Sequence, residues 1–145
     1  SSDTNPFHLK RVLTHRISFK EGKLHGLYEF FYENGKLNFR NCNKNGQRHG
    51  VSEEFHENGK LKLRQRFIND QCHGLYEWFY KSGKPRSRHR FKNGKQYGVS
   101  EQFYKNGKLE LREHYENDQR HGVREQFYKN GKLRLREYYG NGWLI

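Results

Sequence analysis

The sequence predicts an all-β protein, an elongated single-layer antiparallel meander of β-hairpin repeats that are each 24 residues long. The first observation is an unbroken spacing of 24 residues between glycines that each follow a histidine or a tyrosine. The second is a pair of turn signals in every unit. The third is a lean apolar content of 31% in a chain that is nevertheless 16% aromatic. Such a period is typical of arrays in which each unit buries its apolar side chains by stacking on its neighbours.

The period divides almost the whole chain into units. Five repeats follow one another without insertion, at residues 26–49, 50–73, 74–97, 98–121 and 122–145. Residues 1–25 are expected to form a degenerate first repeat that acts as an N-terminal cap. Leu13, Arg16 and Phe19 support this, because they fall where later units carry Leu, Arg and Phe.

Each repeat carries two turn signals. The first is an Asn-Gly or Ser-Gly dipeptide, at positions 34–35, 58–59, 82–83, 106–107 and 130–131. Asn-Gly is the strongest short-range hairpin signal, because a type I′ turn needs a positive φ at both central residues. The second signal is an Asn-Gly or Asn-Asp dipeptide, at positions 45–46, 69–70, 93–94, 117–118 and 141–142. Two turns per unit leave strands of roughly six to eight residues, so we expect about eleven strands in sequential order.

A two-residue first turn fixes the expected strand register. Counting outward from that turn gives the pairs Tyr32–Leu37, Phe31–Asn38 and Glu29–Arg40. The last pair recurs in all repeats and predicts a structural ladder of Glu29, Arg40, Glu53, Arg64, Glu77, Arg88, Glu101, Arg112, Glu125 and Arg136. Directly opposed charges of opposite sign stabilise a sheet by ~0.2–1 kcal/mol per pair. A catalytic role is not expected, because identical copies provide no distinct acid and base.

Alternation of side chains along a strand assigns the predicted faces. One face should carry the ladder, the row Leu27, Val51, Leu75, Val99 and Val123, and the row Phe31, Phe55, Phe79, Phe103 and Phe127. The other should carry Tyr32, His56, Tyr80, Tyr104 and Tyr128 opposite Leu37, Leu61, Pro85, Leu109 and Leu133, with Phe67, Phe91, Tyr115 and Tyr139 further along. We interpret these rows of rings as the core of a single-layer sheet.

Charge is the strongest compositional indication of a partner. The 29 Lys and Arg residues exceed the 16 Asp and Glu residues, which gives a net charge of +13. Such an excess favours contact with nucleic acid, anionic lipid or acidic protein surfaces, and it also serves the solubility of a thin sheet. Cys42 and Cys72 occupy different positions of their repeats, as expected for incidental thiols in a reducing compartment. No apolar run is long enough to span a membrane.

The densest basic segment is KSGKPRSRHRFKNGK, residues 81–95, which contains no acidic residue. Because alternate side chains of a strand share a face, Arg86, Arg88 and Arg90 are expected in one line, with Lys84 and Lys92 nearby. This row predicts an anion-binding or partner-binding site whose affinity falls with salt. The alternative is a solvated strand in which Pro85 discourages edge pairing.

The remaining candidate sites have structural explanations. His25, His49, His73 and His121 recur two strands apart, about 10 Å, which is too far for two of them to share a zinc ion at about 2.1 Å. A role in binding backbone groups next to the following glycine is therefore expected. No catalytic triad order, phosphate-binding loop or dinucleotide fingerprint occurs. We therefore expect no enzymatic activity, no metal and no cofactor.

The recurring pattern G-[LV]-x-E-x-F-Y-x-N-G-K-L-x-x-R…N-G-x-x-H-G resembles the MORN repeat family over residues 13–145. It most resembles the variant type with a Tyr-x-Asn-Gly-Lys-Leu core, as in bacterial antitoxin-like proteins and MORN-repeat proteins of large DNA viruses. Each unit opens Gly-Leu or Gly-Val, where standard repeats open Gly-x-Gly-x-Tyr. The resemblance implies a meander of hairpins used as a scaffold or docking surface. It also implies association with anionic phospholipids or dimer formation in some members.

Three functional hypotheses follow. The first is a non-enzymatic repeat scaffold for protein–protein interaction, with an intracellular location. The second is electrostatic binding of anionic phospholipid or nucleic acid through the central basic row, with a peripheral membrane location in the lipid case. The third is a spacer for a functional domain elsewhere in a longer chain. The apolar end Trp143-Leu144-Ile145 should either fold back over the last rings or pair with another chain, and we favour pairing, for example in a homodimer. At the other end, Pro6 and Lys10-Arg11 are expected to protect the edge.

Overall fold

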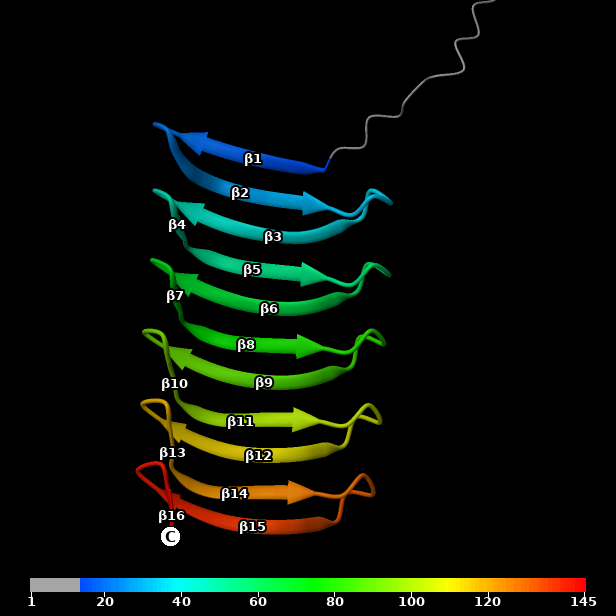
Figure 1. Cartoon of the computed structure of the whole chain (residues 1–145), viewed down its shortest axis with the longest axis vertical. Helices are drawn as coiled ribbons and strands as arrows, with labels where there is room; N and C mark the ends of the chain where they lie inside the picture. Colours follow the sequence, from blue (N-terminus) through cyan, green and yellow to red (C-terminus); the bar gives the residue numbers. More distant parts are fainter. Residues whose placement is uncertain (1–13) are drawn as a thin grey trace, which may run out of the picture.

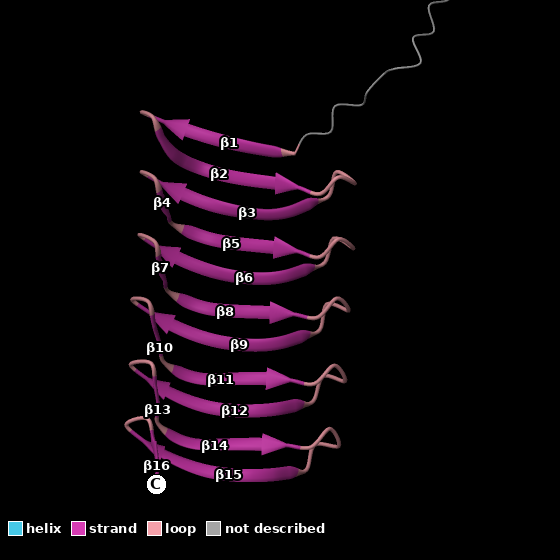
Figure 2. Cartoon of the chain, viewed as in Figure 1, coloured by secondary structure: helices cyan, strands magenta, loops and turns pink. Residues whose placement is uncertain are grey.

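The protein is one open antiparallel sheet in a single layer (Figure 1). The structure is a computed structural model and describes residues 14–145. The predicted protection of the N-terminal edge by Pro6 and Lys10-Arg11, and the predicted position of Leu13, lie outside these residues. Within them the chain forms strands and turns and no helix, so none that could span a membrane (Figure 2).

The sheet contains 16 strands in the described residues. The long ones are β1 (His15–Lys20), β2 (Lys23–Phe31), β3 (Leu37–Lys44), β5 (Gly50–Phe55), β6 (Leu61–Ile68), β8 (Gly74–Phe79), β9 (Pro85–Lys92), β11 (Gly98–Phe103), β12 (Leu109–Glu116), β14 (Gly122–Phe127) and β15 (Leu133–Gly140). Five two-residue strands follow the second turns, namely β4 (Gln47–Arg48), β7 (Gln71–Cys72), β10 (Lys95–Gln96), β13 (Gln119–Arg120) and β16 (Trp143–Leu144). The expected eleven strands correspond to the long ones, and the short ones were not anticipated.

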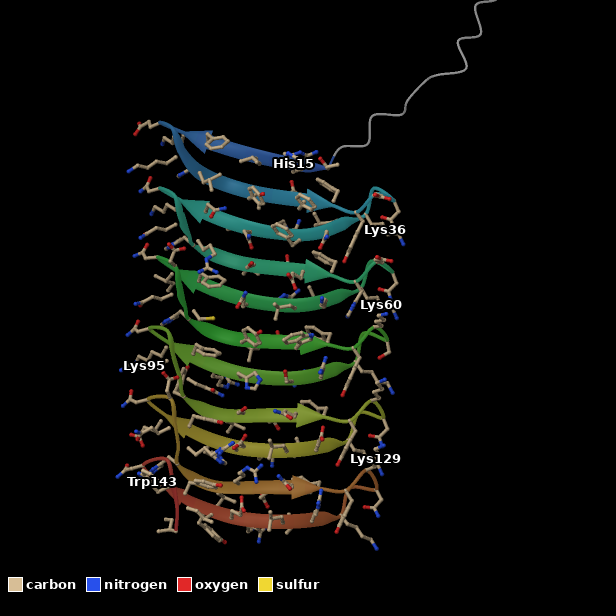
Figure 3. All side chains as sticks on the ribbon, in the orientation of Figure 1. His15, Lys36, Lys60, Lys95, Lys129 and Trp143 are labelled. Atoms are coloured by element: carbon tan, nitrogen blue, oxygen red, sulfur yellow. The ribbon has the colours of Figure 1, made fainter. Side chains whose placement is uncertain are left out.

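The strands lie in sequential order, so each hairpin contacts the hairpin before it and the hairpin after it. All first turns project from one side of the sheet and all second turns from the other (Figure 1). Lys36, Lys60 and Lys129 lie at the first-turn side, whereas Lys95 and Trp143 lie at the second-turn side (Figure 3). The predicted fold class is confirmed.

The first turn is not the type I′ turn that its Asn-Gly dipeptide predicted. The N–H of Gly35 donates to the carbonyl oxygen of Tyr32 at 2.9 Å, and the N–H of Tyr32 donates to that of Lys36 at 2.8 Å. Only Gly35 has a left-handed φ (+83°), whereas Asn34 does not. The Asn34 Oδ1 atom accepts a hydrogen bond from the Lys36 N–H at 2.9 Å. The turn is therefore a wider loop closed by a left-handed glycine, a three-residue connection that brings a bulge with it.

The bulge changes the register predicted next to the turn. Phe30 pairs with Phe39 but Phe31 pairs with Leu37, so Asn38 is an extra residue on β3. The predicted pairs Phe31–Asn38 and Tyr32–Leu37 are therefore wrong, whereas Glu29 and Arg40 are Cα partners as predicted. The same shift occurs in the other four first hairpins.

The second turn is the one with a positive φ at both central residues. In the second turn of the first repeat these are Asn45 (+51°) and Gly46 (+80°), between the paired residues Lys44 and Gln47. Two repeats carry Asp instead of Gly, and Asp70 and Asp118 also adopt a φ of +66°. Asparagine and aspartate tolerate this region better than other residues with a side chain. The type I′ geometry thus belongs to this turn.

Register assigns the two faces of the sheet. We call the face with the glutamates and arginines of the ladder the ladder face; it also carries Leu27 and Phe31, as predicted. Leu37 lies on it as well, opposite Phe31, and this corrects its predicted place opposite Tyr32. We call the other side the opposite face, and it carries Phe67, which pairs with Gly50.

The core lies mainly on the opposite face. Phe67 is the buried apolar side chain of the described residues, with 5% exposure, and the Arg48 guanidinium lies 4.1 Å from the centroid of its ring. Arg48 belongs to β4, so the short strands bring side chains over this face. The predicted rows of rings contribute to it, but polar groups share the core, since Ser87, Ser100 and Glu113 are buried there too.

Hydrogen bonds between repeats tie the hairpins together at both sides. The Tyr32 hydroxyl donates to the carbonyl oxygen of Phe55 at 2.6 Å, and the residues at the same position in later repeats bond the next hairpin in the same way, as His56–Phe79, Tyr80–Phe103 and Tyr104–Phe127. At the second turns the Asp70 N–H donates to the carbonyl oxygen of Arg48 at 2.9 Å. These contacts span 22 or 23 residues and fix neighbouring repeats relative to one another.

The strands at the two ends of the array pair in the same way as the strands inside it. Arg16 of β1 is the Cα partner of Glu29, as Arg40 of β3 is of Glu53. At the C-terminal end, β16 folds back on β15 through the pairs Gly140–Trp143 and Tyr139–Leu144. This is the fold-back alternative, although Trp143 and Ile145 are 80% and 84% exposed. Pairing with a second chain stays a prediction.

Candidate functional site

The glutamates and arginines of the ladder are Cα partners in an unbroken series from Arg16 to Arg136. Glu53 lies between two arginines, with its carboxylate 2.9 Å from Arg40 and 3.2 Å from Arg64. The hairpin pairs Glu77–Arg88, Glu101–Arg112 and Glu125–Arg136 lie at 3.6, 3.1 and 2.8 Å. Glu29 is the Cα partner of Arg40 but its ion pair is with Arg16, at 3.2 Å. Most ladder ion pairs recorded for residues 14–145 therefore join the two strands of one hairpin, and Arg40–Glu53 also joins two neighbouring repeats.

The surroundings of Glu53 favour its charged form. Burial acts to raise its pKa, but hydrogen bonds and charge from Arg40 and Arg64 outweigh burial, and the pKa of Glu53 is lower than its usual value of 4.5. A carboxylate held by two guanidinium groups is an ion-pair element rather than a proton donor at neutral pH. This geometry supports a structural and surface role for the ladder.

The predicted basic row does not form one line. Arg88 contacts Glu77 on the ladder face, and Arg90, the partner of Leu75, lies on the same face. Arg86 instead lies on the opposite face, with its guanidinium 5.4 Å from the centroid of the Trp78 ring. Lys84 and Lys92 lie at the two ends of the strand, Lys84 beside the first turn and Lys92 beside the second. The predicted line of Arg86, Arg88 and Arg90 is therefore wrong, whereas binding of an anion or partner by these residues stays a prediction.

The β-bulge is the physical reason for this division. Trp78 pairs with Ser87 and Phe79 pairs with Pro85, so Arg86 is the extra residue of the bulge. An extra residue interrupts the strict alternation of side chains, because two residues on one strand oppose one on the other. Arg86 therefore leaves the face that Arg88 and Arg90 share.

A recess on the opposite face was missed by sequence analysis. Its volume is about 780 Å³, and its lining includes Trp78, Tyr80 and Arg86 together with lysines from neighbouring hairpins. The signal was present in the sequence, since Trp78 stands where the other repeats carry Phe, Glu or Gln. Strict alternation without the bulge, however, places Arg86 on the ladder face, away from Trp78.

Two members of the histidine row, His49 and His73, bond backbone groups at the second turns. The Nδ1 atom of His49 accepts a hydrogen bond from the Asn69 N–H at 3.4 Å, and that of His73 from the Asn93 N–H at 3.5 Å. These partners are in the next repeat, not beside the following glycine as expected. Residues 14–145 contain no group of three or more His, Cys, Asp or Glu side chains arranged to hold a metal ion.

One serine–histidine contact has the distance of a catalytic dyad. The Ser100 Oγ atom lies 2.7 Å from His89 Nδ1 on the opposite face. Ser100 is only 4% exposed, so its hydroxyl is closed to a substrate. Burial lowers the pKa of His89, although the Glu113 carboxylate acts to raise it. The pair is thus part of the polar core, where a neutral imidazole bonds a hydroxyl.

The hairpin repeats and their two turns agree with a known family. The family model of the MORN repeat variant matches residues 24–41, 48–69, 73–93, 96–117 and 120–141. The chain therefore belongs to the MORN repeat variant family, as its sequence pattern indicated. Repeats of this family are commonly scaffolds that bind proteins or membranes, and the family is typically non-enzymatic.

Two solved structures are similar to this chain. One is an S. aureus TarM mutant in complex with Fondaparinux, alpha-GlcNAc-glycerol and UDP, at 17% identity and a TM-score of 0.43, covering 77% of this chain and 22% of that chain. The other is a crystal structure of TarM, at 19% identity and a TM-score of 0.41, covering 74% of this chain and 22% of that chain. This chain thus spans less than a quarter of either relative. A search of curated proteins found no match.

Proposed function

We propose that this protein is a non-enzymatic repeat scaffold that binds another protein along its ladder face. The observation that carries the proposal is a row of exposed apolar side chains beside the ladder. Leu27, Val51 and Leu75 are 41%, 40% and 37% exposed. The row continues with Val99 and Val123, which line a shallow trough of about 660 Å³. An apolar strip flanked by charges offers both burial and orienting ion pairs to a partner.

The shape of this surface favours an elongated partner. Each repeat contributes one apolar position and one Glu–Arg pair at the same place in its hairpin, so the strip runs across the strands. The trough also contains His114, between Val99 and Val123, and Tyr138, the cross-strand partner of Val123, which widens the apolar area near the C-terminal end. A segment lying across several repeats would make a small contact with each of them, and the affinity would come from their number.

Matched substitutions of exposed leucines test the proposal. Leu75→Glu places a charge in the strip on the ladder face, whereas Leu135→Glu places the same charge on the opposite face at a residue of similar exposure, 42%. Proteins captured from native extract by the wild type should be retained by Leu135→Glu and lost by Leu75→Glu. Thermal unfolding of both variants checks that the fold persists. Capture that depends on Leu135 and not on Leu75 would contradict the proposed face.

A second candidate function is electrostatic binding of anionic phospholipid or nucleic acid, and one observation favours it. The recess beside Trp78 gathers cations on the opposite face. This recess differs from the predicted basic row, since of the five row residues only Arg86 lines it.

A further inference from the structure

The third repeat differs from the others at positions that meet on the opposite face. Trp78 stands where the other repeats carry Phe30, Glu54, Gln102 and Gln126. Its cross-strand partner Ser87 is small, whereas the residues at that position elsewhere are Phe39, Leu63, Leu111 and Leu135. The small serine leaves room for the indole. The array is thus interrupted at a single place by a large ring opposite a small side chain.

The aromatic wall of the recess is held in place by neighbouring groups. The Tyr80 hydroxyl donates to the carbonyl oxygen of Phe103 at 2.7 Å, which fixes the phenol ring. The Arg86 guanidinium lies 5.4 Å from the Trp78 ring centroid and 5.8 Å from that of Tyr80. Cations at such distances are attracted to the faces of the rings. The rings and the guanidinium therefore form one preorganised cluster.

Cations surround this cluster without carboxylates in the lining. Besides Arg86, the recess of about 780 Å³ is lined by Lys62, Lys81 and Lys105. Among the ion pairs that the structure records for residues 14–145, none involves any of these four side chains. Glu110 lines an adjoining recess of about 390 Å³ that shares Trp78, Tyr80 and Arg86. An anion entering the larger recess would meet four ammonium or guanidinium groups.

The recess lies where the charged residue in the first turn changes from acidic to basic along the array. The residue that follows the tyrosine position is acidic in the first two repeats and basic afterwards, in the order Glu33, Glu57, Lys81, Lys105 and Lys129. The recess takes Lys81 and Lys105 from the basic side of this change. The lysines at this turn position therefore belong to the third, fourth and fifth repeats, and the net charge alone does not place two of them in the recess.

From this geometry we infer that the recess binds a single-stranded nucleic acid, with one base against the Trp78 indole and the adjacent phosphates against Arg86 and the lysines. Aromatic rings beside a positive groove are the elements that bind single strands without reading their sequence. Guanidinium and ammonium groups form charge-assisted hydrogen bonds to phosphate oxygens. The site lies on the face away from the proposed protein-binding strip, so it is independent of that function.

The position of the indole favours a strand over a membrane surface. A side chain that inserts into lipid projects from its surroundings, but Trp78 is partly buried and forms a wall of a recess. A base can enter such a recess, whereas a flat bilayer contacts its rim. Lipid headgroups are therefore the competing occupant that the experiment must separate.

The test uses the full chain and a labelled single-stranded oligothymidylate, with binding followed by fluorescence anisotropy. Arg86→Glu is compared with Arg134→Glu, the same change at the equivalent position of the fifth repeat, so that net charge is matched. Trp78→Gln introduces the residue type that Gln102 and Gln126 already have at this position, which protects the fold. We expect wild-type affinity for Arg134→Glu and about a tenfold or greater loss for Arg86→Glu and for Trp78→Gln.

A second measurement reports the indole directly. In a Trp143→Phe background, Trp78 is the remaining tryptophan, and the oligonucleotide should quench its fluorescence. Equal affinities of Arg86→Glu and Arg134→Glu, or binding without quenching, would overturn the inference in favour of diffuse charge attraction. Quenching by phosphatidylserine vesicles but not by the oligonucleotide would overturn it in favour of lipid.

Discussion

The hydroxyl of Tyr104 donates a hydrogen bond to the backbone carbonyl oxygen of Phe127, 23 residues further along the chain, at 2.7 Å. Tyr32 and Tyr80 make the same bond to the hairpins that follow them. A side chain at the start of one first turn thus holds the end of the next strand pair. The hydrogen bond is repeated at the period of the sequence and links repeats that share few apolar contacts.

Removal of one such hydroxyl should lower stability in a measurable way. Tyr104→Phe leaves the part-buried carbonyl of Phe127 without this donor, and we expect a loss of about 1 kcal/mol in the free energy of unfolding. Tyr128→Phe is the control, because Tyr128 is 51% exposed and the structure records no such bond from it. Urea unfolding of both variants gives the comparison. Equal losses would show that the effect of removing the hydroxyl does not come from the interrepeat hydrogen bond.

The ladder should stabilise the sheet chiefly through its glutamates. Glu53→Gln removes the charge between Arg40 and Arg64 and should cost about 1–2 kcal/mol, whereas Arg64→Ala removes one exposed partner and should cost less than about 1 kcal/mol. Because the pKa of folded Glu53 is lower than 4.5, its contribution is present above that pH and is lost as the pH falls through the lower folded value. Glu57→Gln, in the exposed first turn, is the control.

Unfolding at several pH values measures this effect. The wild type should lose more stability than Glu53→Gln as the pH is lowered below about 4.5. Parallel acid profiles for the two proteins would contradict a stabilising role of the Glu53 carboxylate.

The buried imidazole of His89 predicts a different pH dependence. Burial lowers the pKa of His89 below 6.5 in the folded protein, so below 6.5 the unfolded chain binds a proton that the folded chain excludes. Stability should therefore fall as the pH drops from about 6.5 through the lower folded pKa. His89→Gln, which introduces the residue type of Gln65 at the equivalent position, should flatten this part of the profile. The same slope in both proteins would show that other groups are responsible.

The C-terminal strand predicts self-association. Trp143, Leu144 and Ile145 are 80%, 61% and 84% exposed although β16 pairs with β15. An exposed apolar edge favours pairing with another chain. Light scattering should show a concentration-dependent increase in mass for this chain and a smaller one for a version that ends at Asn141. Monomeric behaviour of both at high micromolar concentration would exclude the dimer.

The sequence by itself determined the repeat, the class of fold and part of the register. The spacing of the glycines and the two turn signals predicted a meander of hairpins, because each short segment between turns can form only a strand. The Glu29–Arg40 type of pair lies beyond the bulge, whose extra residue offsets the one-residue shift of the longer loop, so the predicted cross-strand partners are the observed ones. These features depend on local conformation and on a 24-residue period, and both can be read from the sequence without knowledge of any contact.

The tertiary structure alone decided the form of the first turn and the faces next to it. Asn-Gly stands in both kinds of turn, so the dipeptide could not distinguish a type I′ turn from a loop with a bulge. At Asn45-Gly46 both residues are left-handed, whereas at Asn34-Gly35 only the glycine is. The loop there is held by the Asn34 side chain and the Tyr32 backbone.

One extra residue was enough to change the candidate site. Since the side-chain period of a strand is two, a shift of one residue moves a side chain to the other face. It brought Leu37 to the ladder face, and it separated Arg86 from Arg88 and placed it beside Trp78. Contacts between residues 23 positions apart add to this, because they form only when neighbouring hairpins stack. The basic row was predictable as a composition, but the recess was decided by packing.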